Sequence, residues 1–309
     1  MGVVVHSFHF RRPKTALEFL EYSHSLGAAG VQVPLTIKQQ QDLKTVRDQA
    51  GDWGMYVEGM ARLPKTEDTS RFDKTIREAS EVGARCVRAV CLNGRRYETF
   101  DSLSDWRDFV AESKAAIARA IPICEKHKVA LAVENHKDWT LEEHLKLLKE
   151  YESEYFGVNL DTGNNVSLLD EPMEHAEALA PYTFATHIKD VGVEEYEDGF
   201  LLAEVPFGQG ILDLPKLAAI LREKRPTTKL SLEMITRDPL KIPCLTKKYW
   251  KTFPDRNGRY LANMFSIVRK NKPAQPLPRL DGLDQAAKAR LAEDNVKLCL
   301  DFAKAKMGL

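Results

Sequence analysis

The sequence has few of the features that would set it apart from ordinary globular proteins. Its 309 residues include only five cysteines, an odd number with no Cys-x-x-Cys pair, which argues against a disulfide framework. No apolar run approaches the ~20 residues needed to span a bilayer. The first residues carry basic side chains after a short apolar run rather than before it, unlike a signal peptide. We therefore expect a cytoplasmic protein with reduced cysteines and no membrane partner.

The chain also lacks an excess of charge of either sign. It has 45 Lys and Arg and 45 Asp and Glu, so a large basic surface that binds nucleic acid is not expected. Hydrophobic residues make up 43% and charged residues 29% of the chain, values that exclude disordered and fibrous classes. No repeat, low-complexity segment or glycine-rich phosphate motif is present. These absences leave a folded protein with a small-molecule partner as the expectation.

What is present is an alternation of short apolar runs and longer amphipathic stretches. The runs are rich in Val, Ile, Leu or Ala and lack polar alternation, which is typical of parallel strands buried on both faces. They cover residues 3–8, 30–35, 55–61, 86–92, 129–135, 155–161, 183–190 and 229–234. Helical patterns lie between them at 14–30, 74–84, 104–127, 140–151 and 212–224. Thr140 and Glu143 have the spacing of a capping box.

This order predicts an α/β fold, a (β/α)8 TIM barrel, as a single domain over residues 1–309. The barrel would cover about 1–236, with a long acidic loop at 190–210 after strand seven that includes a short strand, FLLAEV. A C-terminal extension over about 237–309 would hold two helices, near 258–271 and 281–306. A doubly wound sheet is the alternative, which the missing glycine-rich first turn disfavours.

Four apolar strands each end in one ionisable residue: Glu134, Asp161, His187 and Glu233. In a barrel the carboxyl ends of the strands face the active site, so these side chains would converge. Three unpaired buried carboxylates would repel at a cost of several kcal/mol, which a divalent cation would relieve. Three oxygen ligands and one nitrogen suit Mn²⁺ or Mg²⁺, with Co²⁺ or Zn²⁺ as alternatives. A metal-free network of these residues with Lys189 is the competing interpretation.

The motifs at these strand ends resemble the xylose isomerase-like TIM-barrel superfamily of sugar isomerases and epimerases. Tagatose 3-epimerase-like and hydroxypyruvate isomerase-like enzymes are among its members. The resemblance covers about residues 1–236 and depends on VENH, NLDTGN, THIKD, FGQGILD and LSLEM. It implies that Glu134, Asp161, His187 and Glu233 hold the metal and that the two glutamates also move protons on the substrate. It further implies an enediolate intermediate and leaves a homo-oligomer open, because family members are often dimers or tetramers.

The chain departs from the family at two positions. Many members carry a histidine three residues after the strand-six aspartate, where this chain has Asn164, and many carry an arginine after the strand-seven histidine, where it has Lys189. An amide beside an ammonium suits an anionic or oxidised substrate, such as a sugar acid or keto-sugar, better than a neutral ketose. We expect Lys189 to contact substrate rather than to serve only in a salt bridge within the barrel.

Further candidates for substrate contact follow from their places at strand ends. They are His6, Glu58 and His136, together with Asn164 and Lys189. Glu58 has an alternative interpretation, an ion pair with Arg62 or Arg88. Of His136 and Lys137, one is expected to face the pocket and the other to be a solvated loop residue.

Several function classes remain to be weighed. The first is a metal-dependent isomerase or epimerase of a sugar or oxidised sugar, and the second is a lyase on the same scaffold that decarboxylates or eliminates. An abasic-site endonuclease would need histidines on strands two and three, where GVQVPL and MYVEGMA have none. A non-enzymatic binding module conflicts with the intact set of four candidate ligands. A mass change on turnover separates the first two classes.

Overall fold

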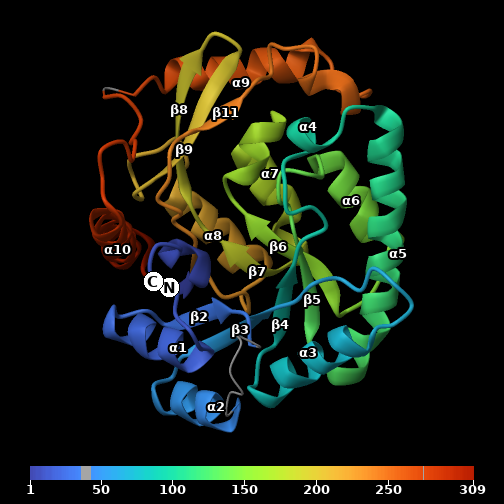
Figure 1. Ribbon diagram of the computed structural model, residues 1–309, viewed down its shortest axis with the longest axis vertical. Coiled ribbons are helices and arrows are strands. Elements are labelled where there is room, and N and C mark those ends of the chain that lie inside the picture. The colour runs from blue at the N-terminus through green and yellow to red at the C-terminus, as the bar shows by residue number, and fades with distance from the viewer. Residues whose placement is uncertain (36–42, 274) are drawn as a thin grey trace.

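The computed structural model describes residues 1–35, 43–273 and 275–309. Its main sheet has eight parallel strands in the order β10-β1-β2-β3-β4-β5-β6-β7, and a parallel bridge from Ile188 to Leu232 links the two ends of this row. The strands therefore form the expected barrel, with helices arranged around it (Figure 1). The barrel strands are β1 (Gly2–Val4), β2 (Gly30–Val33), β3 (Tyr56–Met60), β4 (Cys86–Ala89), β5 (Ala130–Glu134), β6 (Phe156–Asp161), β7 (Thr183–His187) and β10 (Ser231–Leu232).

The helices confirm the expected alternation and add to it. Those between strands are α1 (Ala16–Ser25), α2 (Leu43–Asp52), α3 (Ser70–Glu81), α4 (Arg96–Thr99), α5 (Leu103–His127), α6 (Leu141–Glu150), α7 (Pro172–Leu179) and α8 (Leu214–Lys224). The predicted capping box at the start of α6 is present. The sequence interpretation did not include α2, α7 or the single turn of α4. It also extended the first strand to residue 8, whereas residues Val5–Phe8 form a 3₁₀ turn.

The two ends of the barrel differ in character. At the amino-terminal end, a Cβ atom added to Gly2 or Gly30 would lie 2.1 or 2.4 Å from the side chain of Tyr56. The Tyr56 hydroxyl donates to the carbonyl of Leu230 at 3.0 Å, so the ring of Tyr56 lies across the amino-terminal end of the barrel. Every residue of β5 and β6 is buried, and the last residue of each is a carboxylate. The polar groups thus gather at the opposite, carboxyl end of the strands.

A second, antiparallel sheet follows strand β7, where the sequence predicted a long loop with one short strand. Its strands are β8 (Asp190–Tyr196), β9 (Gly199–Val205) and β11 (Leu240–Ile242), in the order β11-β9-β8. The predicted FLLAEV strand is confirmed as β9, but the rest of the segment is also strand. This correction has a local cause, because Tyr196 pairs with Gly199 across a tight turn and the hairpin continues to Asp190 opposite Val205.

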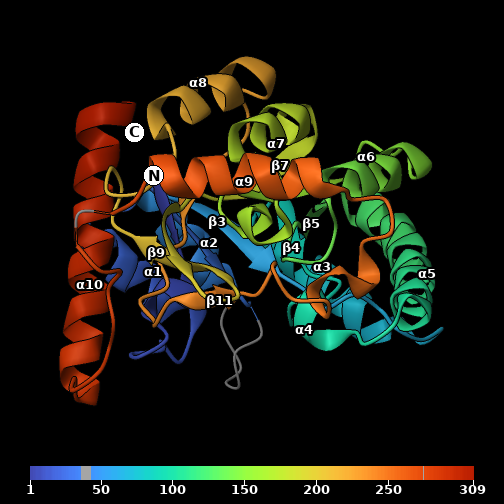
Figure 2. The same ribbon diagram turned by 90° about the horizontal axis from the view of Figure 1, so that it is seen from above.

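The C-terminal extension contains the two predicted helices, α9 (Gly258–Lys270) and α10 (Gln285–Phe302). Seen from above, α9 runs across the molecule and α10 lies along one edge (Figure 2). The chain before α9 includes a 3₁₀ turn at Tyr249–Thr252, and residues Ala303–Met307 after α10 form a π-helical turn. Among the described residues, no helix combines the length and apolar character needed to cross a membrane.

Candidate functional site

Four ionisable side chains meet at the carboxyl end of the barrel. Glu134, Asp161 and His187 are the last residues of β5, β6 and β7, and Glu233 directly follows β10. From His187 Nδ1 the nearest oxygens of Glu233, Glu134 and Asp161 lie at 3.3, 3.5 and 3.8 Å. All four residues are buried. The structure thus brings together the four side chains that the sequence predicted to converge.

A glutamine that the sequence reasoning did not single out orients His187. Gln32 in β2 lies 2.7 Å from His187 Nε2 through its Oε1 atom, and its Nε2 donates to Glu58 at 3.0 Å and Asn159 at 3.1 Å. Because a carboxylate and an amide oxygen accept from the Gln32 amide nitrogen, its carbonyl oxygen faces the imidazole. His187 therefore donates through Nε2 and turns Nδ1 toward the carboxylates. A cation bound at Nδ1 would replace the proton there, and a hydrogen bond donated by the other ring nitrogen is typical of metal-ligating histidines.

Asp161 is held in a similar way. Its Oδ1 atom accepts hydrogen bonds from the backbone amides of Gly163 at 2.9 Å and Asn164 at 2.8 Å. Asn135 fixes the backbone of Asp161 on both sides, accepting from its amide and donating to its carbonyl, each at 2.8 Å. Among the described residues, His187 Nδ1 is buried without a hydrogen-bond partner. Asp161 Oδ2 is also buried and has the Lys189 ammonium 2.9 Å away as its charged neighbour. Both atoms belong to the cluster of possible ligand atoms, and a cation there would compete with Lys189 for Asp161 Oδ2.

Cationic side chains surround the cluster. Lys189 Nζ lies 2.6 Å from Glu233, 2.9 Å from Asp161 Oδ2 and 3.4 Å from Glu204 of β9. Arg88 forms an ion pair with Glu134. The predicted substrate residue Lys189 is thus also the centre of three salt bridges, and Glu204 is a further acidic group that the sequence reasoning missed. The sequence pattern that could have identified Glu204 is the one that identified the four predicted ligands, namely a single ionisable residue within an apolar strand.

The charges around the site set its protonation. Burial alone would raise the pKa of Glu134 and Glu233, but Arg88 and His187 hold the pKa of Glu134 well below its ordinary value. His187 and Lys189 do the same for Glu233. Burial opposes protonation of His187, yet the two carboxylates raise its pKa to about 9. Both glutamates are therefore ionised near neutral pH and can each accept a proton.

The donor set fits a divalent cation. Glu134, Asp161 and His187 each offer one atom within 4.8 Å of the others. Carboxylate oxygens with one imidazole nitrogen match Mn²⁺, Mg²⁺ or Zn²⁺. His187 Nδ1, which is buried without a hydrogen-bond partner among the described residues, is an atom that a cation would need, which supports the fit.

The other predicted residues occupy different positions around this centre. His6 lies 3.1 Å from Glu233 and is partly exposed at the mouth, and Asn164 donates to Glu134 at 3.1 Å. His136 contacts the carbonyl of Leu92 through Nδ1 at 2.9 Å. These three residues lie at the carboxyl end of the barrel as expected.

Glu58 lies deeper in the barrel than expected. It accepts from Gln32 and from the Ser231 hydroxyl at 3.3 Å, and burial raises its pKa to about 7. Among the described residues, neither of the predicted alternative partners, Arg62 and Arg88, forms an ion pair with Glu58, and Arg88 pairs with Glu134 instead, so that interpretation was wrong. Glu58 reaches His187 only through Gln32, which places it behind the metal-binding atoms.

The expectation that His136 or Lys137 would be solvated is also wrong. Lys137 is only 5% exposed, and its ammonium donates to Asn164 Oδ1. His136 is half-buried. The loop turns inward because the carboxylate of Asp138 accepts from the backbone amides of His136, Trp139 and Leu92, at 3.1, 2.9 and 3.3 Å.

The C-terminal extension reaches the loops that carry the site. Arg256 is buried and donates to the Leu168 carbonyl at 2.6 Å and to Asp170. Asp170 also accepts from Asn165 at 2.6 Å, and Asn165 in turn accepts from Asn135, which holds Asp161. A chain of hydrogen bonds thus connects the extension to a predicted metal ligand.

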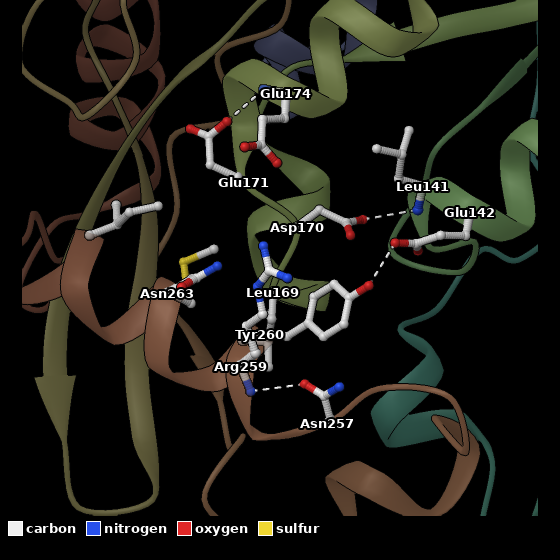
Figure 3. Close-up of a pocket in the computed structure, with 12 residues that line it drawn as sticks. Leu141, Glu142, Leu169, Asp170, Glu171, Glu174, Asn257, Arg259, Tyr260 and Asn263 are labelled. Atoms are coloured by element: carbon white, nitrogen blue, oxygen red, sulfur yellow. Dashed lines mark hydrogen bonds between the residues drawn. The ribbon is translucent and has the colours of Figure 1, made fainter.

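An outer pocket lies where α9 meets α6 and the segment before α7 (Figure 3). Tyr260 of α9 donates to Glu142 at 2.8 Å, and Asp170 accepts from the backbone amide of Leu141 at 3.1 Å. None of the four predicted metal ligands lines this pocket. It marks where the extension docks and is separate from the barrel centre.

Comparisons with known proteins agree with this architecture. The family described as xylose isomerase-like TIM barrel matches residues 20–252 of this chain. An uncharacterized Escherichia coli protein, YihM, is 26% identical over 148 residues, 48% of this chain and 42% of that protein. The match therefore spans less than half the length of this curated relative.

Three solved structures share the fold. The D-psicose 3-epimerase of Clostridium cellulolyticum, solved with D-tagatose, has a TM-score of 0.64 at 12% identity, covering 99% of this chain and 98% of that one. A xylose isomerase-like protein of Mycobacterium smegmatis in complex with magnesium has a TM-score of 0.55 at 16% identity, covering 87% and 97%. The probable 3-DHS dehydratase AsbF of Bacillus anthracis has a TM-score of 0.59 at 17% identity, covering 83% and 99%.

Proposed function

Because this chain belongs to the xylose isomerase-like TIM-barrel family, we propose that it is a divalent-metal-dependent isomerase or epimerase of a sugar or oxidised sugar. The observation that carries this proposal is the burial and convergence of Glu134, Asp161, His187 and Glu233, with His187 Nδ1 left without a hydrogen bond among the described residues. Enzymes of this fold include the 3-epimerase named above. A sugar acid or keto-sugar is the preferred substrate class because cationic side chains surround the cluster.

The chemistry follows from the two ionised glutamates. A bound divalent cation would act as a Lewis acid toward a substrate carbonyl and its neighbouring hydroxyl, and would stabilise an enediolate. Glu134 and Glu233 extend from β5 and β10 and lie 3.5 and 3.3 Å from His187. One glutamate would remove the proton next to the carbonyl, and the other would return it on a different face or carbon. His6, His136, Asn164 and Lys189 would orient the substrate hydroxyls, with Glu58 behind them.

The first prediction concerns the metal itself. Protein purified without chelator should contain close to one divalent cation per chain, with Mn²⁺ or Mg²⁺ preferred and Co²⁺ or Zn²⁺ as alternatives. Asp161→Asn should weaken that binding at least about ten-fold, because the amide replaces a charged ligand. Elemental analysis and calorimetric titration with MnCl₂ measure both.

The matched control is Asp68→Asn, the same change at an exposed aspartate that accepts from the backbone amide of Ser70 and is not one of the predicted ligands. This variant should bind the metal as the unmodified protein does. Metal-supplemented protein that binds none of the four cations would contradict the proposed function.

A lyase on the same scaffold is the second candidate. Two points favour it: the dehydratase among the proteins of this fold, and Asn164 at a position where the resemblance places a histidine in many family members. An epimerase and a dehydratase both begin by removing a proton next to a carbonyl, whereas a decarboxylase reaches an enolate by losing carbon dioxide. Turnover in D₂O separates them. An epimerase exchanges a proton for deuterium and otherwise keeps all atoms of the sugar, whereas a lyase releases water or carbon dioxide. A mass loss in the product would replace the first candidate by the second.

The free cysteines support our proposal that the protein is cytoplasmic. All five are free, and four of them are buried. Free buried thiols suit the reducing cytoplasm, where we place the enzyme.

A further inference from the structure

The ammonium of Lys137 is buried beside a neutral hydrogen-bond acceptor. The residue is 5% exposed, and its ammonium donates to Asn164 Oδ1. Among the described residues it forms no ion pair with a carboxylate, unlike Lys189 with its three. A buried ammonium has three donors and is costly to leave without compensating charge. The position therefore has unused capacity to bind an anion.

The backbone holds Lys137 in this inward position. Its φ angle is +64°, in the left-handed region that residues other than glycine rarely adopt. The Lys137 carbonyl accepts from the backbone amide of Arg96 at 3.0 Å, and Asp138 caps the surrounding amides. Strained backbone of this kind persists where the surroundings enforce it, and it gathers at binding and catalytic sites.

A narrow cavity with room for about one water molecule lies beside the ammonium, so a larger group would have to displace part of its wall. Lys137 lines it together with Asn164, Lys189, Glu204 and Arg237, and apolar residues complete the wall. Glu204 is already shared, since it pairs with Lys189 at 3.4 Å and with Arg237 at 2.9 Å. Burial and the nearby charges of Lys189 and Arg237 lower the pKa of Lys137 to about 8, so the amine remains mostly protonated at neutral pH. Cations therefore outnumber anions on this side of the site.

The net charge of the whole cluster also favours an anionic ligand. Four carboxylates, those of Glu134, Asp161, Glu204 and Glu233, lie among four cationic side chains, those of Arg88, Lys137, Lys189 and Arg237. This set is close to neutral when His187 is counted as uncharged, the form in which its Nδ1 atom would bind a cation. A divalent cation would leave it with two positive charges in a buried environment, a state that an anionic ligand would stabilise.

We propose that Lys137, assisted by Arg237, binds an anionic group of the substrate, and that the substrate is a sugar acid rather than a neutral ketose. This inference deepens the proposed function and rests on it for the identity of the reacting sugar. Asn164 links the two regions, because it contacts the Lys137 ammonium through Oδ1 and Glu134 through Nδ2. A carboxylate on Lys137 would therefore anchor the sugar one side chain away from the proton-moving glutamate. The partly exposed Arg237 lies where the ligand would enter.

The test compares ligands that differ only in charge. D-tagaturonate carries a carboxylate where D-tagatose carries a hydroxymethyl group, and D-fructuronate and D-fructose form a second such pair. Each is titrated by calorimetry into the full-length protein, once metal-free and once with Mn²⁺. We expect the unmodified protein to bind at least one acid about ten-fold or more tighter than its neutral counterpart. Lys137→Gln should remove that preference and leave the affinity for the ketose unchanged.

Lys128→Gln is the matched control. Lys128 also has a positive φ, +55°, but it is exposed at the end of α5. This variant should retain the full preference for the acid, and Lys137→Arg should retain much of it. The unmodified protein tests the idea even if a variant misfolds.

Two results would overturn the anion site. The first is that the unmodified protein binds acid and ketose with equal affinity, or binds neither. The second is that Lys137→Gln weakens the binding of acid and ketose equally. Metal content of the same samples keeps the two proposals apart. Protein that binds Mn²⁺ without preferring acids contradicts only the Lys137 assignment. Protein that prefers acids through Lys137 but binds no metal contradicts only the proposed function.

Discussion

Glu134→Gln and Glu233→Gln should each abolish turnover while leaving the barrel folded. The amide keeps the shape of the side chain but cannot accept the substrate proton, and it is a weaker metal ligand. General acid–base catalysis alone contributes about 10²–10⁴-fold, so the combined loss in kcat should exceed that range. Activity is measured on whichever sugar the unmodified protein converts, with deuterium incorporation from D₂O as the second readout.

The control for these variants is Glu174→Gln, which makes the same change on the exposed surface of α7. Its kcat should match that of the unmodified protein. Metal content measured beside activity separates loss of the base from loss of the ligand. A Glu134 or Glu233 variant that binds metal and keeps near-normal kcat would remove that residue from proton transfer.

Arg256→Met should lower the stability of the whole chain. Arg256 is buried in an ion pair with Asp170, and the substitution leaves that carboxylate buried without its partner. Removing one member of a buried ion pair costs about 3–5 kcal/mol. The free energy of unfolding, from urea titration followed by circular dichroism, should fall by that amount. Arg259→Met provides the control, because Arg259 is exposed on the same segment.

The same variant should also affect the site, because Asp170 is connected to Asp161 through Asn165 and Asn135. The affinity for Mn²⁺ should therefore decrease in Arg256→Met and stay constant in Arg259→Met. Unchanged stability together with unchanged metal affinity would show that the extension does not support the barrel centre.

The barrel and the four converging residues could be predicted because each depends on a local pattern. Buried parallel strands appear as apolar runs, and a single charge at the end of such a run identifies the residue that faces the site. Glu134, Asp161 and His187 each fit that description. The missed helices lacked a comparable pattern: α2 buries only Val46 and Ala50, and α7 has eight residues.

Other features could not be predicted because no local signal marks them. The inward direction of Lys137 depends on a positive φ angle at a residue that is not glycine, which the sequence does not reveal. The partner of Asp170 lies 86 residues further along the chain, in a segment without strand or helix periodicity. Glu58 was placed at the right strand, but its contacts with Gln32 and Ser231 depend on the depth at which it enters the barrel.

The way β1 meets β10 has a consequence for biosynthesis. Gly2 pairs with Ser231, and the contact between His6 and Glu233 joins residues 227 positions apart. At about 5–20 residues per second, a ribosome would need roughly 10–45 s between the synthesis of β1 and the synthesis of β10. During that interval the first strand has β2 as a neighbour but no second one. The cluster of Glu134, Asp161, His187 and Glu233 is therefore complete only after Glu233 has been made, and the proposed metal binding would report that the nascent chain has closed.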